Sequence, residues 1–159
     1  VFYAMLTLPM KEQSQGELLI SDFDAIVVKE MLHYLYTDFA PEKAFLQEHG
    51  ESLLFIAIKY QIPGLIVACE DYFVTTLQVE TAIATLKFAE ESGAVGLKQK
   101  TMHFIAQNAS RIIQMKEFHD LEEDLLKETH SIIDVVNKRK GCSRSAEKER
   151  RFTFGCSIM

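Results

Sequence analysis

Apolar residues recur along most of this chain with the spacing of an α-helix, and this pattern limits the possible folds more than any other feature. In residues 28–36 they stand at i, i+3, i+4, i+7 and i+8, which places one apolar stripe on a helix ending near residue 37. Similar stripes follow in residues 51–60, 63–77, 82–89, 97–105 and 118–136. Pro63 suits the first position of one helix, and Gly93 suits the end of another. The sequence therefore predicts a mainly α fold.

A single short segment has the pattern of a strand. Glu17-Leu18-Leu19-Ile20 is brief and largely apolar, and Ser21-Asp22 follows it as a typical helix N-cap. We therefore expect one short buried strand that leads directly into the first helix.

The composition is that of a globular domain. Of the 159 residues, 48% are hydrophobic and 25% are charged, which is enough to bury one core or two small ones. No run approaches the ~20 apolar residues that cross a bilayer, and the first residues do not resemble a signal peptide. Three scattered cysteines do not form a disulfide framework. We expect an intracellular protein of the nucleus, the cytoplasm or both.

Charge divides the chain into an acidic body and a basic end. Residues 138–159 hold seven basic and two acidic side chains, which leaves ten basic and 21 acidic side chains in residues 1–137. An acidic body repels phosphate, so nucleic-acid binding by the folded part is disfavoured. Residues 138–159 lack apolar periodicity and are predicted to be disordered. Lys138-Arg139-Lys140 could serve as a nuclear-import signal.

Residues able to support catalysis are present but have no catalytic spacing. His119 and His130 would stand ~16 Å apart on one helix, too far to bind the same metal ion. The run Glu122-Glu123-Asp124 is more typical of a solvated helix face than of an acid and base pair. Cys69 lies on an apolar stripe and is expected to be a small buried hydrophobe. We predict a non-enzymatic protein without a metal or a cofactor.

Several ordered blocks resemble a known family. These blocks are Phe2-x-Ala4-Met5, Met10-Lys11-Glu12, Lys29-Glu30-Met31-Leu32-x-Tyr34-Leu35-Tyr36-Thr37-Asp38, Tyr60-Gln61-Ile62-Pro63-Gly64-Leu65 and Cys69-Glu70-Asp71. Together they resemble the second half of a BTB/POZ domain. Val79-Glu80-Thr81-Ala82 and Leu97-Lys98-x-Lys100 resemble the helical BACK region of speckle-type POZ proteins. The resemblance implies a BTB portion in 1–77, BACK-like helices in 78–137 and a tail in 138–159.

The resemblance also implies a function. Speckle-type POZ proteins are substrate adaptors of cullin-RING ubiquitin ligases and dock on the cullin through BTB and the first BACK helices. Their docking signature is a hydrophobic residue, any residue and then Glu, which matches Met10, Lys11 and Glu12 here. An apolar anchor beside one carboxylate is typical of an interface hot spot. A BTB scaffold in transcriptional or cytoskeletal organisation, without cullin binding, is the alternative.

Parts of the family pattern are missing from this sequence. The first strand and helices of BTB, which form most of the dimer interface, have no counterpart, and neither does a substrate-binding MATH domain. We therefore expect an N-terminally truncated chain, whose full-length parent forms the homo-oligomer and binds the substrate protein. Without those elements, helices 51–60 and 63–77 are expected to expose apolar rows.

The last four residues match a lipidation motif. Cys156-Ser157-Ile158-Met159 fits the C-a-a-X prenylation pattern, with Arg150 and Arg151 just upstream. One lipid with a basic patch can hold a protein at an anionic membrane. Membrane attachment is expected only if Cys156 is prenylated, and a chance ending is the alternative.

Overall fold

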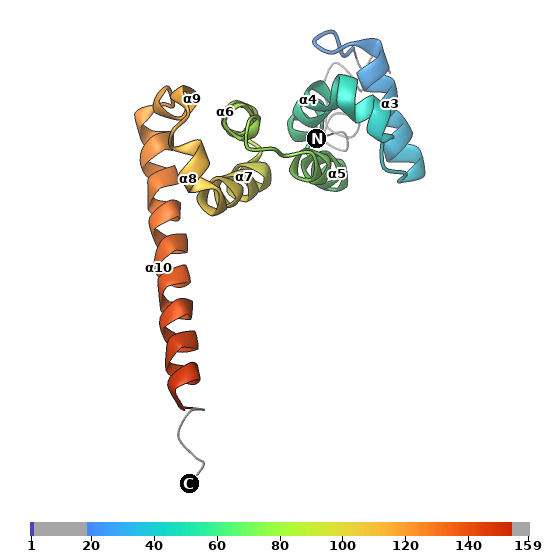
Figure 1. The fold of residues 1–159 in the computed structure, drawn as a ribbon. Coiled ribbons are helices and arrows are strands. Elements are labelled where there is room, and N and C mark those ends of the chain that lie inside the picture. The colour runs from blue at the N-terminus through green and yellow to red at the C-terminus, as the bar shows by residue number, and fades with distance from the viewer. Residues whose placement is uncertain (2–18, 154–159) are drawn as a thin grey trace. The chain divides into compact units, whose positions relative to one another are not determined.

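The computed structural model describes residue 1 and residues 19–153, with side chains as far as residue 138. Within these residues there are eight α-helices and no strand (Figure 1). The helices are α3 (Ala25–Thr37), α4 (Lys43–Lys59), α5 (Pro63–Thr75), α6 (Ala82–Ser92), α7 (Val95–Gln107), α8 (Ala109–Ile112), α9 (Lys116–His119) and α10 (Glu123–Thr153). The prediction of a mainly α fold is confirmed.

The predicted strand is not found in the part of it that is described. Residues 17 and 18 lie outside the described residues, and Leu19 and Ile20 have irregular backbone. A strand needs a second strand to satisfy its backbone hydrogen bonds. The described residues supply no such partner.

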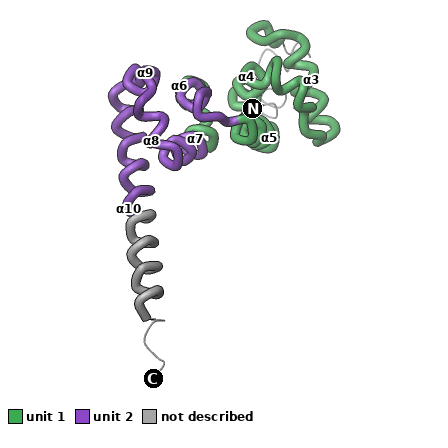
Figure 2. The backbone as a smooth tube through the Cα atoms, in the orientation of Figure 1, with its two compact units in different colours: residues 1–76, 88–98 green, residues 77–87, 99–159 purple. Residues whose placement is uncertain are grey.

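The chain divides into two compact units (Figure 2). Unit 1 comprises residues 1–76 and 88–98, and unit 2 comprises residues 77–87 and 99–159. The division passes through α6 and α7, so one part of each helix belongs to each unit. The predicted domain boundaries, at residues 77 and 137, stay predictions.

Unit 1 is built around α4, which packs against both α3 and α5. Leu53, Leu54, Ile56 and Ala57 of α4 are fully buried, because apolar residues cover most of the circumference of this helix. The predicted exposure of apolar rows on helices 51–60 and 63–77 is therefore wrong for these four residues. The other buried members of this core are Val27, Met31, Leu46, Tyr60, Ile62, Leu65, Cys69, Ala89, Ala94 and Leu97.

α4 begins well before the segment whose apolar pattern predicted it. Residues 43–51 hold several good helix formers but few apolar positions, so hydrophobic periodicity alone does not reveal this half of the helix. Gly50 also weakens the signal, since glycine is a poor helix former. A Cβ at position 50 would lie 3.3 Å from Cζ of Phe73, so glycine here allows α5 to approach closely.

Gln61 and Ile62 form the corner between α4 and α5. Gln61 has a left-handed backbone (φ 53°), and Ile62 N donates to Ala57 O at 2.9 Å. This is the Schellman arrangement that satisfies the last carbonyl groups of a helix. Pro63 then occupies the start of α5, where its missing N–H leaves no helical hydrogen bond unmade.

Unit 2 has its own core around Phe118, which is fully buried. The remaining buried apolar residues of this core are Ala82, Ile83, Leu86, Met102, Ile105, Ala106, Ala109, Ile112, Leu121, Leu125 and Ile133. Thr129 is also buried, and its hydroxyl donates to the Leu125 carbonyl at 2.7 Å. The predicted helix over 118–136 is interrupted, since Phe118 lies in α9 and α10 starts only at Glu123.

α10 continues to Thr153, past the point where the apolar pattern ends. Residues 138–153 are drawn as part of this helix and residues 154–159 lie outside the described part, so the predicted disorder of residues 138–159 stays a prediction. Residues 138–151 hold seven Lys or Arg and two Glu, whose intrinsic preference is helical even without a packing face. No helix in the described part of the chain is both long and apolar enough to cross a membrane.

Candidate protein-interaction surface

The residues predicted to carry function fall mostly outside the described structure. Met10, Lys11 and Glu12 of the predicted cullin-binding segment lie outside it, and so does Cys156 of the prenylation motif. Their roles stay predictions. The structure describes the side-chain contacts and the exposed surface of residues 19–138.

The five histidines all lie in the described part of the chain. His119 lies on α9 and His130 on α10, so the prediction that they share one helix is wrong. Their rings pack edge-on against Phe118, with ring centroids 5.9 Å and 5.4 Å from its centroid. Within the residues searched, no group of three or more His, Cys, Asp or Glu side chains could hold a metal ion.

Cys69 is fully buried in unit 1, as its place on an apolar stripe predicted. Burial, with a smaller contribution from the negative charge of Glu70, raises the pKa of the Cys69 thiol to about 12. The nucleophilic thiolate is therefore very scarce near neutral pH. Cys69 serves as a packing residue and not as a reactive one.

The most distinctive surface of unit 1 is an apolar row that α3 and the residue after its C-cap expose. Leu32, Leu35, Tyr36 and Phe39 are 41%, 43%, 88% and 70% exposed. We name these four residues the α3 surface. Val27 and Met31 instead make the fully buried contacts of this helix.

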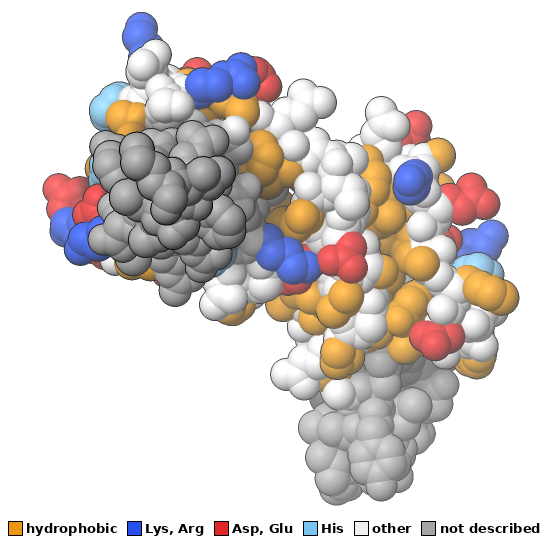
Figure 3. All heavy atoms as spheres, turned by 60° about the horizontal axis from the view of Figure 1, so that its bottom comes forward, with side chains coloured by type: hydrophobic (Ala, Val, Ile, Leu, Met, Phe, Trp, Pro, Cys, Tyr) orange, Lys and Arg blue, Asp and Glu red, His pale blue; other side chains and the backbone are white. Residues whose placement is uncertain are grey.

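Helical periodicity predicted Leu32, Leu35 and Tyr36 on one stripe with Met31, but they are exposed and Met31 is buried. α3 has two adjacent apolar rows, and only the row with Val27 and Met31 is buried within unit 1. Exposed apolar residues that gather on one surface often mark an interaction site. Figure 3 shows one face of the molecule, where hydrophobic side chains, in orange, lie among charged ones.

Two shallow grooves lie beside α3. The first has a volume of about 530 Å³ and is lined by Leu19, Ile20, Phe23, Ala25, Val28, Lys29 and Leu32. The second has a volume of about 400 Å³ and is lined by Lys29, Glu30, His33, Phe39, Ala40, Glu42 and Phe45. Lys29 borders both grooves. The first groove is otherwise apolar, whereas Glu30, His33 and Glu42 also line the second. The first groove therefore suits an apolar side chain of another polypeptide.

One ion pair holds the segment before α3 against α4. Lys59 donates a hydrogen bond to Asp22, and its ammonium group lies 5.6 Å from the ring centroid of Phe23. The hydrogen bond from Lys59 lowers the pKa of Asp22, and the same bond raises the pKa of Lys59. Both side chains are about half exposed. The two residues are far apart in the sequence, and no local motif predicted their contact.

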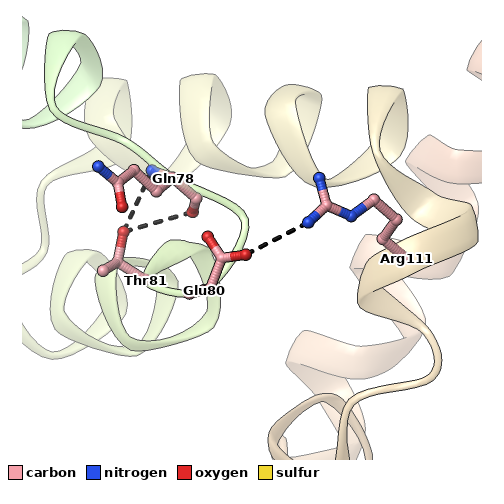
Figure 4. Close-up of polar contacts among 4 residues, drawn as sticks. All are labelled: Gln78, Glu80, Thr81 and Arg111. Atoms are coloured by element: carbon pink, nitrogen blue, oxygen red, sulfur yellow. Dashed lines mark hydrogen bonds and ion pairs between the residues drawn. The ribbon is translucent and has the colours of Figure 1, made fainter.

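Unit 2 has polar contacts at the start of α6. The Thr81 hydroxyl accepts a hydrogen bond from Gln78 N at 3.2 Å, and Arg111 Nη2 donates to Glu80 Oε1 at 3.3 Å (Figure 4). Both members of the Arg111–Glu80 pair are well exposed, so the pair contributes little stability. Its partners come from α8 and from the turn before α6. It is a structural contact with no sign of a reactive site.

Comparison with known proteins identifies the family. Residues 1–77 match the model of the BTB/POZ domain. The chain is 37% identical to the mouse (Mus musculus) TD and POZ domain-containing protein 5 over 125 residues. These residues make up 77% of this chain and 36% of that protein. It is 36% identical over 123 residues to the mouse TD and POZ domain-containing protein 3, covering 76% of this chain and 33% of that protein.

The similarity is longer than the BTB/POZ match. A third mouse relative, TD and POZ domain-containing protein 2, is 35% identical over 125 residues, which is 77% of this chain and 34% of that protein. The similarity therefore extends beyond residue 77, although the chain spans only about a third of the length of these relatives. BTB domains are non-catalytic modules that mediate protein interactions. Residues 1–77 therefore carry a match to the BTB/POZ domain, and the chain is related to the TD and POZ domain-containing proteins.

Proposed function

We propose that this chain acts in a substrate adaptor of a cullin-RING ubiquitin ligase. The match of residues 1–77 to the BTB/POZ domain carries the proposal, because it makes the chain a protein-interaction module. The resemblance to speckle-type POZ proteins supplies the finer assignment. In that assignment Met10 and Glu12 dock on the cullin, and Lys11 occupies the variable position of the signature.

The surface of unit 1 supports a role in protein binding. Its α3 surface exposes four large apolar side chains, and the groove lined by Leu19, Ile20 and Phe23 adds apolar walls beside Lys29. Desolvating large apolar and aromatic side chains is a main source of affinity at protein interfaces. A module with such a surface needs no reactive group to act.

A pull-down with a purified cullin N-terminal region tests the proposal. We expect the unaltered chain to retain the cullin, and Met10→Glu or Glu12→Lys to reduce binding at least tenfold. The first change puts a charge into an apolar contact, and the second reverses the charge of the register-fixing group. Lys11→Ala is the matched control, because the signature accepts any residue at this position.

Circular dichroism of each variant separates lost binding from lost folding. Helical content equal to that of the unaltered chain, with binding lost only at positions 10 and 12, supports the proposal. Cullin binding that survives both charge changes would overturn it. A folded chain that ignores the cullin but self-associates would favour the alternative of a BTB scaffold with another role.

A further inference from the structure

The hairpin between α6 and α7 belongs to unit 1, although it comes after the BTB-matching residues along the chain. Ala89, Ala94 and Leu97 from this hairpin are buried in the same core as α4 and α5. The family match ends at residue 77 and does not include them. We call residues 88–98 the strap.

The strap has a defined shape. Gly93 follows the last residue of α6 with a left-handed backbone (φ 72°), and Ala94 N donates to Ala89 O at 3.0 Å. Gly93 N also donates to Glu90 O at 3.1 Å, which completes a Schellman ending. Lys98 Nζ lies 2.6 Å from Glu90 Oε2 and joins the start of α7 to the end of α6. The strap is therefore a preformed turn.

Aromatic contacts hold one end of the strap in unit 1. The ring of Phe88 lies edge-on to Phe55 of α4, with their centroids 5.5 Å apart, and is tilted against Phe73 of α5 at 5.4 Å. Aromatic pairs at these separations contribute about 0.5–1.5 kcal/mol beyond the area they bury. These contacts fix the α6 end of the strap to both helices.

A buried carboxylate faces the other end. Glu70 of α5 is only 6% exposed, and its carboxylate lies against the backbone of Gly96 in the first turn of α7. A Cβ at position 96 would stand 2.7 Å from Oε1 of Glu70 and closer still to Oε2. Any residue other than glycine at position 96 would therefore clash with the Glu70 carboxylate unless that side chain moved.

The chemistry of this contact is favourable. The first backbone N–H groups of a helix have no partner within the helix, and the helix dipole makes this end positive. A buried carboxylate in turn needs hydrogen-bond donors or positive charge to offset its lost hydration. Glu70 at the start of α7 lies at the positive end of the helix dipole, which contributes to offsetting this cost alongside the other polar contacts of Glu70.

We infer that Glu70 latches the strap to α5, so that residues 63–75 and 95–98 open and close as one cooperative element. The BTB-matching unit then depends for its stability on residues beyond the family boundary. A displacement of the first turn of α7 would therefore break the contact with Glu70 and so disturb α5. The inference concerns the folding of unit 1 and does not rest on cullin binding.

A double-mutant cycle on the full chain tests the latch. We expect Gly96→Ala alone to raise the unfolding equilibrium constant about tenfold or more, because the new methyl group displaces the buried carboxylate. In a Glu70→Ala background the methyl group has space, and alanine favours helix over glycine. There Gly96→Ala should leave the unfolding equilibrium unchanged or lower the constant. An equal destabilisation in both backgrounds would overturn the inference.

Hydrogen exchange with Glu70→Gln gives a second measurement that does not need the alanine variants to fold. Loss of the charge should speed exchange about five- to tenfold in residues 63–75 and 95–98 together. The matched control is Glu91→Gln, an exposed carboxylate on the same hairpin, which should change neither segment. Faster exchange in only one of the two segments, or no change in either, would refute a cooperative latch.

Discussion

Unit 1 and unit 2 are both helical and both have a packed core, but they differ in what they leave at their surfaces. Among the described residues, the large apolar side chains that are well exposed lie in unit 1, with Val135 of unit 2 as the exception. Apart from Val135, the large apolar side chains described in unit 2 are buried or half-buried around Phe118. The difference teaches that the described part of unit 1 exposes the apolar surface of an interaction module, whereas the described part of unit 2 packs its apolar side chains within itself.

The largest expected effect comes from removing the centre of unit 2. Phe118→Ala should destabilise this unit by about 3–5 kcal/mol, because it deletes a fully buried aromatic ring and leaves a cavity. Hydrogen exchange followed by mass spectrometry should show lost protection in residues 123–136, while residues 51–59 of unit 1 keep theirs. Phe39→Ala, at a residue that is 70% exposed, is the control and should change stability by less than about 0.5 kcal/mol.

A parallel loss of protection in both units would contradict the claim that the units are separately stable. It would mean that they unfold as one cooperative body, although each has its own core. Protection lost in unit 2 alone would support separate stabilities.

Sequence patterns predicted most of the helices in both units because helix formation follows local rules. Pro63 at the start of α5 and Gly93 at the end of α6 act through their own backbone preferences, so they could be interpreted without a structure. The first half of α4 could not be found in this way. It is held by packing, such as the approach of Phe73 to Gly50, and not by an apolar stripe.

Long-range contacts limited how much of the candidate interaction surface could be predicted from the sequence. Whether Leu35 is buried or exposed depends on which elements cover α3, and periodicity cannot tell two adjacent apolar rows apart. The run Cys69-Glu70-Asp71 served only as a family marker, although Glu70 is buried against Gly96. The predicted cullin-binding segment at residues 10–12 lies outside the described residues and remains a prediction from resemblance.

Substitutions of two buried threonines in unit 2 should change the free energy of unfolding by smaller amounts, in opposite directions. Thr129→Val removes a hydroxyl that donates to Leu125 O, and should cost about 0.5–1.5 kcal/mol. Thr101 Oγ1 is buried and has no hydrogen-bond partner among the described residues, so Thr101→Val should be neutral or stabilising by about 1 kcal/mol. Chemical denaturation of the two variants checks the difference. Equal destabilisation would mean that the Thr101 hydroxyl is satisfied in solution.

The smallest change in stability is expected for a substitution on the α3 surface. Such a substitution tests the exposed apolar surface that distinguishes unit 1 from unit 2. Leu35→Lys and Val135→Lys are matched, since the two residues are 43% and 46% exposed on helices of different units. Each change should alter the free energy of unfolding by less than about 0.5 kcal/mol, because neither side chain belongs to a core.

Their effects on association should differ. Leu35 has Leu32, Tyr36 and Phe39 as exposed apolar neighbours along the chain, so a lysine there breaks up a group of apolar side chains, whereas Val135 is the one large apolar side chain that the described part of unit 2 exposes well. We expect Leu35→Lys to reduce the binding of an apolar dye and the concentration-dependent light scattering of the chain, and Val135→Lys to leave both unchanged. If both lysines lower the two signals equally, the apolar surface is shared by the units and unit 1 has no special capacity to bind a partner.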